Sequence, residues 1–136
     1  MGHKVLVVDD DPLTQRILQH YLERAGYEMI GAHNGREAIK RAKQDLPKLI
    51  ILDVMMPDMD GWTVLRQIQK TETTKTIPVI LLSGNAELMA TEAAMQSGAT
   101  QVLVKPINPE QLLAVIRRVL PETPEDRPSD QNEKSQ

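Results

Sequence analysis

Polar side chains that could do chemistry directly follow short apolar runs at several points in the sequence. A pair of carboxylates follows the first run, one carboxylate follows a central run, and a hydroxyl and an ammonium follow two later runs; these residues are Asp9, Asp10, Asp53, Ser83 and Lys105. In open parallel sheets, ligands bind beyond the carboxyl ends of the strands. If the runs are parallel strands, these five side chains share one edge of the sheet.

Carboxylates gathered at one edge need a compensating charge, because like charges a few ångströms apart raise one another's pKa. A hard divalent cation removes this cost, and Mg²⁺ keeps several waters that phosphate oxygens can replace. Lys105 would add a further positive charge, and Asp is one of the side chains that accept phosphoryl groups as nucleophiles. The residues therefore predict a magnesium pocket that holds a phosphoryl group on a carboxylate oxygen.

A simpler interpretation applies to any one of these acids taken alone. An Asp after a strand is commonly a turn or helix-capping residue. We assign that role to Asp11, which precedes Pro12 at the expected start of a helix. For Asp9, Asp10 and Asp53, the presence of Ser83 and Lys105 at matching strand ends favours the pocket.

Alternating strand and helix patterns must position these residues. Five apolar runs predict the strands Val5–Val8, Glu28–Ala32, Leu49–Leu52, Val79–Leu82 and Val102–Val104. The first, third and fourth runs are continuously apolar, which is typical of strands covered on both faces. Helical patterns follow each strand, so we predict an α/β fold with a parallel sheet and helices on both faces.

The expected helices have recognisable ends and faces. The first covers Pro12–Ala25 and stops at Gly26, with an apolar face of Leu13, Ile17, Leu18, Tyr21, Leu22 and Ala25. Asn34 is expected to cap the second, with Glu37 as its capping-box partner, and Asp60 to cap the third. A fourth runs from about Glu87 to Ser97, and a fifth begins near Pro109.

Composition narrows the class of protein further. The chain has 136 residues, 40% of them hydrophobic, and a net charge of −3. Residues 121–136 hold five acids and two bases, which leaves 14 acids and 14 bases in residues 1–120. The chain therefore lacks the surplus of basic residues that is typical of a nucleic-acid-binding surface. No apolar run approaches membrane-spanning length and no signal-peptide pattern is present, so we expect a cytoplasmic protein.

The motifs together resemble a known family. VLVVDDDP, LIILDVMMPDMDG, PVILLSG and VLVKP occur in the order and spacing of the receiver domain of two-component response regulators. The resemblance covers residues 4–120, nearly all of the expected domain at 1–120. It implies a flavodoxin-like, doubly wound five-stranded parallel sheet of order 2-1-3-4-5 with five helices. Residues 121–136 would be a disordered acidic tail or the start of a linker.

The resemblance also implies roles for the pocket residues. Asp53 would be the phosphoacceptor and would bind Mg²⁺ with Asp10 and the Met55 backbone carbonyl, while Asp9 would act mainly through water. Ser83 and Lys105 would contact the phosphoryl group, and Lys105–Pro106 is expected to be a cis peptide. The donor would be a sensor histidine kinase or a histidine phosphotransfer protein. The domain would catalyse its own phosphorylation and dephosphorylation, with no metabolite turnover.

One position departs from the family pattern, and two others are expected to tune the reaction. Val102 stands where the family usually places Tyr or Phe, so the usual aromatic part of the switch is absent. Signalling would then rely on the Ser83–Met89 loop and the fourth helix, or Val102 is simply a packed strand residue and output uses another surface. The side chains of Met55 and Asn85 are expected to influence the lifetime of the phosphoryl group.

Two other functions are compatible with these residues. A non-phosphorylated receiver-like interaction scaffold is the alternative, and a metal-dependent phosphohydrolase is less favoured because Met55 stands where such enzymes carry a second Asp. The chain would act alone on a downstream protein, or would regulate an output domain outside the given sequence. We expect no direct nucleic-acid or membrane binding, and a monomer or a weak phosphorylation-linked dimer.

Overall fold

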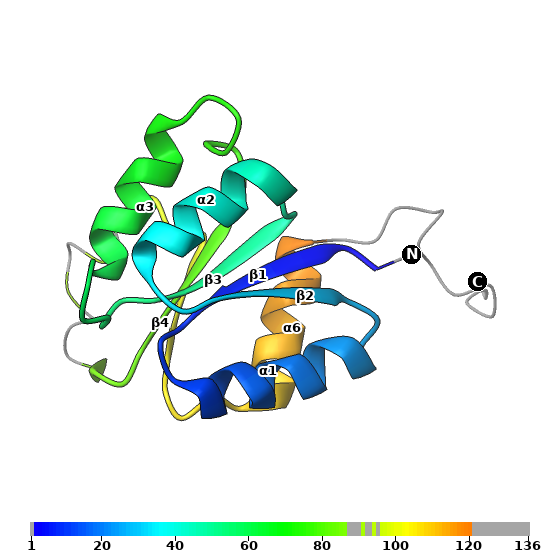
Figure 1. Ribbon diagram of the computed structural model, residues 1–136. Coiled ribbons are helices and arrows are strands. Elements are labelled where there is room, and N and C mark those ends of the chain that lie inside the picture. The colour runs from blue at the N-terminus through cyan, green and yellow to red at the C-terminus, as the bar shows by residue number, and fades with distance from the viewer. Residues whose placement is uncertain (1, 87–90, 92–93, 95, 121–136) are drawn as a thin grey trace.

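A five-stranded parallel sheet forms the centre of the molecule in the computed structural model, which describes residues 2–86, 91, 94 and 96–120 (Figure 1). The strands are β1 (Lys4–Val8), β2 (Glu28–Ala32), β3 (Leu49–Asp53), β4 (Val79–Ser83) and β5 (Gln101–Val104). All neighbouring pairs are parallel, and the order is β2-β1-β3-β4-β5. The predicted sheet, with its order, is confirmed.

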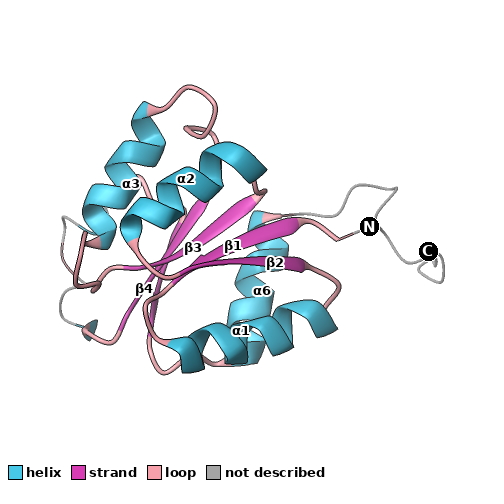
Figure 2. Cartoon of the chain, viewed as in Figure 1, coloured by secondary structure: helices cyan, strands magenta, loops and turns pink. Residues whose placement is uncertain are grey.

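Helices cover both faces of this sheet. They are α1 (Pro12–Arg24), α2 (Gly35–Asp45), α3 (Gly61–Lys70) and α6 (Pro109–Val119). Helices α2 and α3 lie on one face, and α1 and α6 lie on the other (Figure 2). The helix predicted for about Glu87 to Ser97 falls largely outside the described residues.

The core consists of two aliphatic layers, one on each side of the sheet. Successive strand side chains point to opposite faces, so Leu6, Ile50 and Leu81 join the layer under α2 and α3. Val7, Ile51 and Ile80 join the layer under α1 and α6. Every residue of β3 and β4 is buried, which confirms that the continuously apolar runs are strands covered on both faces.

The apolar face predicted for α1 was partly wrong. Leu18 and Leu22 are buried as expected, but Leu13 is 59% exposed and Ile17 is 40% exposed. The third buried residue of the helix is polar Gln15. Gln15, Leu18 and Leu22 share the stripe that faces the sheet, and at 100° per residue Leu13 lies on the opposite side of the helix.

Side-chain caps fix where the helices begin. The carboxylate of Asp11 accepts a hydrogen bond from Leu13 N–H at 3.0 Å, so α1 starts directly after Asp9 and Asp10. Asn34 and Asp60 cap α2 and α3, as predicted. In a capping box, Glu37 would accept from the N–H of Asn34, the N-cap residue. It accepts instead from the N–H of His33, one residue earlier, at 2.8 Å. These caps hold the loops that carry the acidic residues.

Candidate functional site

Asp9 lies just beyond β1 with only 1% of its surface exposed, and both of its carboxylate oxygens are engaged. Oδ1 accepts from Asp11 N–H at 2.9 Å, and Oδ2 accepts from Lys105 Nζ at 2.9 Å. The Asp9 N–H donates to Ala32 O at 3.1 Å, extending the β1–β2 ladder by one residue. Asp9 is therefore held firmly by neighbours on three elements.

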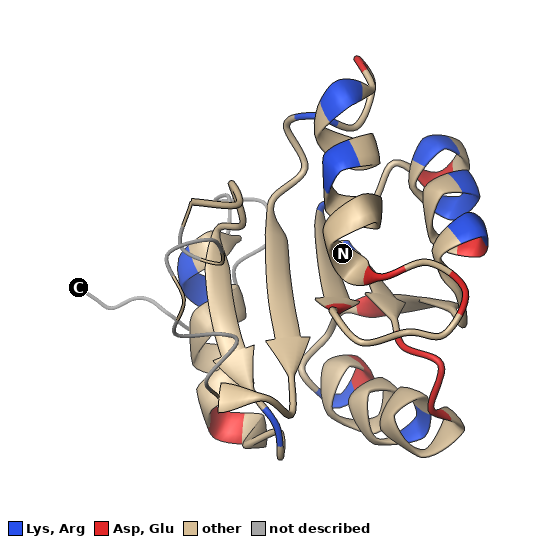
Figure 3. Cartoon of the chain, turned by 90° about the vertical axis from the view of Figure 1, so that its left-hand side faces the viewer, with Lys and Arg blue, Asp and Glu red and all other residues tan. Residues whose placement is uncertain are grey.

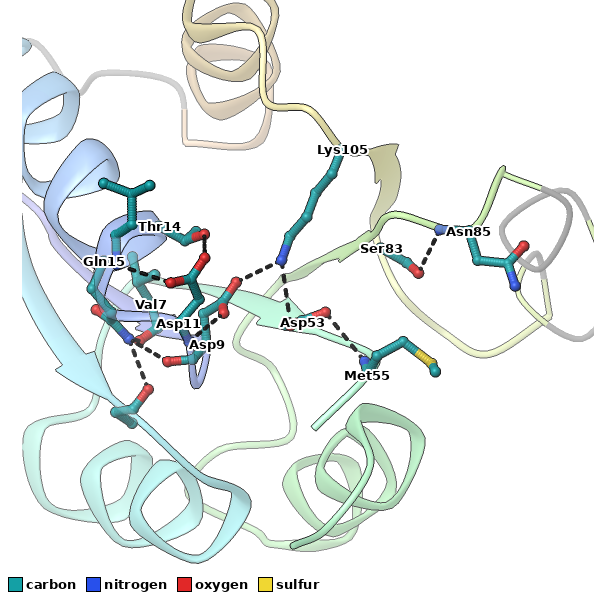
Figure 4. Close-up of polar contacts among 12 residues, drawn as sticks. Val7, Asp9, Asp11, Thr14, Gln15, Asp53, Met55, Ser83, Asn85 and Lys105 are labelled. Carbon is teal, nitrogen blue, oxygen red and sulfur yellow. Dashed lines mark hydrogen bonds and ion pairs between the residues drawn. The ribbon is translucent and has the colours of Figure 1, made fainter. Parts of the chain in front are cut away.

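Asp53 is the last residue of β3 and is 4% exposed. Its Oδ1 accepts from Met55 N–H at 3.1 Å, and its Oδ2 lies 3.4 Å from Lys105 Nζ. One ammonium thus bridges two buried carboxylates from different strands (Figure 4). The structure brings together Asp9, Asp53 and Lys105 as the sequence predicted.

Asp10 completes an acidic cluster at this edge. One ligand oxygen from each of Asp9, Asp10 and Asp53 can be chosen so that all lie within 4.8 Å of one another. Asp10 is exposed, and no hydrogen bond within the described part of the chain engages its carboxylate. Figure 3 shows acidic segments meeting at the carboxyl ends of the strands. Three clustered carboxylates, one of them without a hydrogen-bond partner among the described residues, suit a hard cation such as Mg²⁺.

The charges within this cluster shift two pKa values. Burial raises the pKa of Asp53 above its ordinary value, and the nearby Asp9 charge raises it further; Lys105 and the Met55 N–H oppose this without cancelling it. Burial alone would lower the pKa of Lys105, but its hydrogen bond to Asp9 and the charges of both carboxylates raise it. Lys105 is therefore a permanent cation at neutral pH.

Ser83 is fully buried at the end of β4, the strand next to the one that ends in Asp53. In the described part of the chain, its hydroxyl is not hydrogen-bonded to the acidic cluster. Its Oγ accepts from Asn85 N–H at 3.0 Å, and its carbonyl accepts from Lys105 N–H at 2.8 Å. Within the described residues, the Ser83 hydroxyl makes no hydrogen bond to Asp53 or Lys105. The Lys105–Pro106 peptide is cis, as predicted.

Val102 lies in β5 opposite Leu81 of β4 and packs, partly buried, against the core layer under α2 and α3. Its proposed effect on the switch stays a prediction. Part of the Ser83–Met89 loop and most of the fourth helix lie outside the described residues.

Two residues important to the site gave no clear signal in the sequence. Gln15 looks like an ordinary surface residue of an amphipathic helix, yet it is 7% exposed and donates to three main-chain carbonyls beside Asp9. Gly61 ends the motif LIILDVMMPDMDG, but no local pattern shows why a glycine stands there. A Cβ built on Gly61 would lie 2.6 Å from Asp53 O, and its N–H donates to Val54 O at 2.8 Å.

Fold and site together define a class of protein: a doubly wound α/β domain with an acidic, lysine-bridged pocket at the carboxyl edge of its sheet. Comparison with known sequences identifies the family. The chain belongs to the response regulator receiver domain family, whose pattern matches residues 5–117.

Individual relatives agree with this assignment. The chain is 40% identical over 117 residues to a probable transcriptional regulator ycf27 of Pyropia yezoensis, covering 86% of this chain and 47% of the relative. It resembles the structure of chemotaxis protein CheY4 of Vibrio cholerae with a TM-score of 0.82 and 37% identity, over 88% of this chain and 100% of that one. A third neighbour is the receiver domain of sensor histidine kinase PA1611 from Pseudomonas aeruginosa, with a magnesium ion coordinated in its active site cleft (TM-score 0.78, 26% identity, 87% and 97% coverage).

The chain spans about half the length of several curated relatives that it matches, including the ycf27 protein. Among the described residues, no helix combines the length and apolar character needed to cross a membrane. The domain is a signalling module of response regulators, and its acidic cluster is consistent with Mg²⁺ binding.

Proposed function

We propose that Asp53 accepts a phosphoryl group from a phosphohistidine, presented by a sensor histidine kinase or a histidine phosphotransfer protein. The observation that carries this proposal is Lys105 Nζ, which lies 2.9 Å from Asp9 Oδ2 and 3.4 Å from Asp53 Oδ2 at the mouth of an acidic cluster. The buried Asp53 carboxylate lies close to both the Lys105 ammonium and the exposed Asp10 carboxylate. This arrangement suits the binding of an anion at Asp53 better than the capping of a helix.

The transfer needs one bond to form and one to break. An Asp53 carboxylate oxygen attacks phosphorus, the bond from phosphorus to the histidine nitrogen breaks, and its electron pair stays on the imidazole. The Met55 N–H holds Asp53 Oδ1 in place. Lys105 neutralises charge on the phosphoryl oxygens, and Ser83 donates its hydroxyl proton to one of them, because accepting from Asn85 leaves that proton available.

Mg²⁺ held by Asp10, Asp53 and the Met55 carbonyl, and by Asp9 through water, would supply further neutralisation of phosphoryl charge. The donor set fits this assignment. Asp9 has both oxygens hydrogen-bonded, which suits an indirect role, while the Asp10 carboxylate has no competing partner among the described residues.

The modified domain would act as a switch rather than as a metabolic enzyme. It would catalyse its own phosphorylation and later hydrolysis, in the cytoplasm, and change the affinity of a surface for a partner. That partner would be a downstream protein or an output domain beyond the domain at 1–120, with 121–136 as an acidic tail or linker. We expect no direct binding of nucleic acid or membrane by this chain.

Intact-mass spectrometry with acetyl phosphate as donor tests the proposal. We expect the wild type to gain the mass of one phosphoryl group in Mg²⁺ and not in EDTA, and Asp53→Asn to gain none. Absence of an adduct in wild type with acetyl phosphate and with a phosphohistidine protein would favour the non-phosphorylated scaffold. Continuous phosphate release from unrelated phosphate esters would instead favour a phosphohydrolase.

A further inference from the structure

Gln15 of α1 clamps the main chain that carries the acidic pair. Its Nε2 donates to the carbonyl oxygens of Val7 at 3.1 Å, Asp9 at 3.0 Å and Ala32 at 2.9 Å (Figure 4). An amide nitrogen has two hydrogens, so one of them is shared between acceptors. The acceptors lie at the carboxyl ends of β1 and β2, and the clamp therefore ties α1 to both strands where the pocket begins.

The clamp acts on the peptide that leads into Asp10. The Asp9 carbonyl and the Asp10 amide nitrogen belong to one planar peptide unit. A hydrogen bond to that carbonyl therefore restricts the direction in which the Asp10 side chain leaves the backbone. The preceding peptide is held as well, because Asp9 N–H donates to Ala32 O. Asp10 is exposed, and no side-chain bond in the described residues holds it, so its orientation depends on this backbone.

We propose that Gln15 is a positioning residue of the metal site: its carboxamide fixes the Asp9–Asp10 peptide so that the Asp10 carboxylate meets those of Asp9 and Asp53. Gln15 would touch neither the cation nor the phosphoryl group. The inference rests on the proposed function, because it concerns the cation which that function requires. Gln15 would thus influence cation affinity through the main chain, without being a ligand.

Gly31 provides the space that the clamp occupies. It lies in β2, and a Cβ built on it would come within 2.9 Å of Gln15 Oε1. Gly31→Ala would therefore push the Gln15 amide from its place while leaving its donors intact. This gives a second way to disturb the clamp, from another element and without removing Gln15.

Two variants and one control test the proposal by isothermal titration with MgCl₂. Gln15→Met keeps the length of the side chain but removes the donors, and Gly31→Ala displaces them. The control is Gln19→Met, because Gln19 is exposed, one turn further along α1, and its Nε2 donates to the Glu23 side chain, at 3.2 Å. We expect Kd for Mg²⁺ to rise roughly tenfold in both test variants and to stay unchanged in the control.

A second readout needs no metal. In Mg²⁺-free protein, the Asp11 N–H donates to Asp9 Oδ1, so its hydrogen exchange should be faster in Gln15→Met and Gly31→Ala than in wild type. Far-UV circular dichroism checks that each variant is folded. Folded variants with lower stability but wild-type Kd would overturn the positioning role. Failure of the wild type to bind Mg²⁺ would overturn the proposed function together with this inference, whereas normal wild-type binding with unaffected variants would contradict only the role of Gln15.

Discussion

At the scale of single residues, charge balance governs the pocket. Three carboxylates lie together, and Lys105 is the cation that contacts two of them. Burial of Asp53 and the neighbouring Asp9 charge together outweigh Lys105, which explains why the pKa of Asp53 is raised although a lysine lies beside it. Ionised Asp53 therefore costs the metal-free fold some stability, and a bound cation would remove that cost.

This cost predicts a pH dependence for the metal-free protein. A carboxyl whose pKa is raised on folding binds more protons in the folded state, so stability falls as pH rises from its ordinary pKa to the raised value and stays lower above it. Lys105 remains protonated over this range and adds no slope. In EDTA at pH 7, Asp53→Asn should have a larger free energy of unfolding than wild type, measured by urea denaturation.

The matched control for this experiment is Asp58→Asn, which changes an exposed acid outside the cluster. It should leave the pH profile close to that of wild type. A metal-free Asp53→Asn that is less stable than wild type at pH 7 would show that Asp53 contributes favourably to the metal-free fold, contrary to this account.

Gly61 is required by close packing rather than by its backbone angle. A Cβ there would lie 2.6 Å from Asp53 O and 2.7 Å from the Cα of Val54, both main-chain atoms that cannot easily move. Gly61→Ala should lower the free energy of unfolding by about 1–3 kcal/mol, measured in urea. Gly84→Ala is the control, because nothing lies within 4 Å of a Cβ at that position. Equal stabilities of the two variants would refute the packing argument.

At the scale of elements, the end of α2 stores a small strain. Leu46 caps this helix with φ 46° and ψ 60°, a left-handed conformation that costs a Cβ-bearing residue roughly 1–2 kcal/mol. Its side chain is 50% exposed, so a smaller residue loses little burial. Leu46→Gly should raise the free energy of unfolding by roughly 0.5–1 kcal/mol after the added freedom of the unfolded chain is counted.

The same substitution at Leu13 should have the opposite sign. Leu13 is 59% exposed but lies in the first turn of α1, where its conformation is helical, so Leu13→Gly should destabilise by up to about 1 kcal/mol. Both effects can be measured by thermal and urea denaturation. A destabilised Leu46→Gly would mean that the apolar contacts of Leu46 outweigh its strain.

Helices and strands were more predictable from the sequence than the buried face of α1 or the hydrogen bonds of Gln15. Strands such as Leu49–Asp53 and caps such as Asn34 follow from local patterns, because apolar runs and capping side chains act within a few residues. The orientation of α1 did not follow, since Leu13 and Ile17 obey helical periodicity but are exposed. The burial of Gln15 depends on carbonyls of two strands, one of them 17 residues away, which no local pattern reveals.

The pocket itself was predictable for a topological reason. Asp9 and Lys105 are 96 residues apart in sequence, yet parallel strands bring them to one edge, where their side chains lie 2.9 Å apart. The hydrogen bond from Asn85 N–H to Ser83 Oγ could not be inferred, because it depends on the conformation of a loop.

At the scale of the whole molecule, cation binding and folding should be coupled. The carboxylates come from the ends of β1 and β3 and meet only in the folded chain. A cation that binds only the folded state stabilises it by about 2.7 kcal/mol at one hundred times Kd. Tm should therefore rise with MgCl₂ in wild type and much less in Asp10→Asn, whereas an equal rise in both would contradict the assigned ligand.

The association state is a further prediction for the whole molecule. We expect a monomer, or a weak dimer that appears only on phosphorylation. Sedimentation velocity of the domain, with and without beryllium fluoride and Mg²⁺, measures this directly. A tight dimer in the absence of either addition would contradict the prediction.

The central claim is that Asp53 is the residue that accepts phosphate, and chemical trapping tests it most directly. After incubation with acetyl phosphate and Mg²⁺, borohydride reduction converts an aspartyl phosphate into homoserine, which peptide mass spectrometry can locate. The account predicts homoserine at position 53 in wild type, none in EDTA, and none in Asp53→Asn. Homoserine at position 9 or 10 with unmodified Asp53, or a phosphorylated protein with no homoserine, would contradict it.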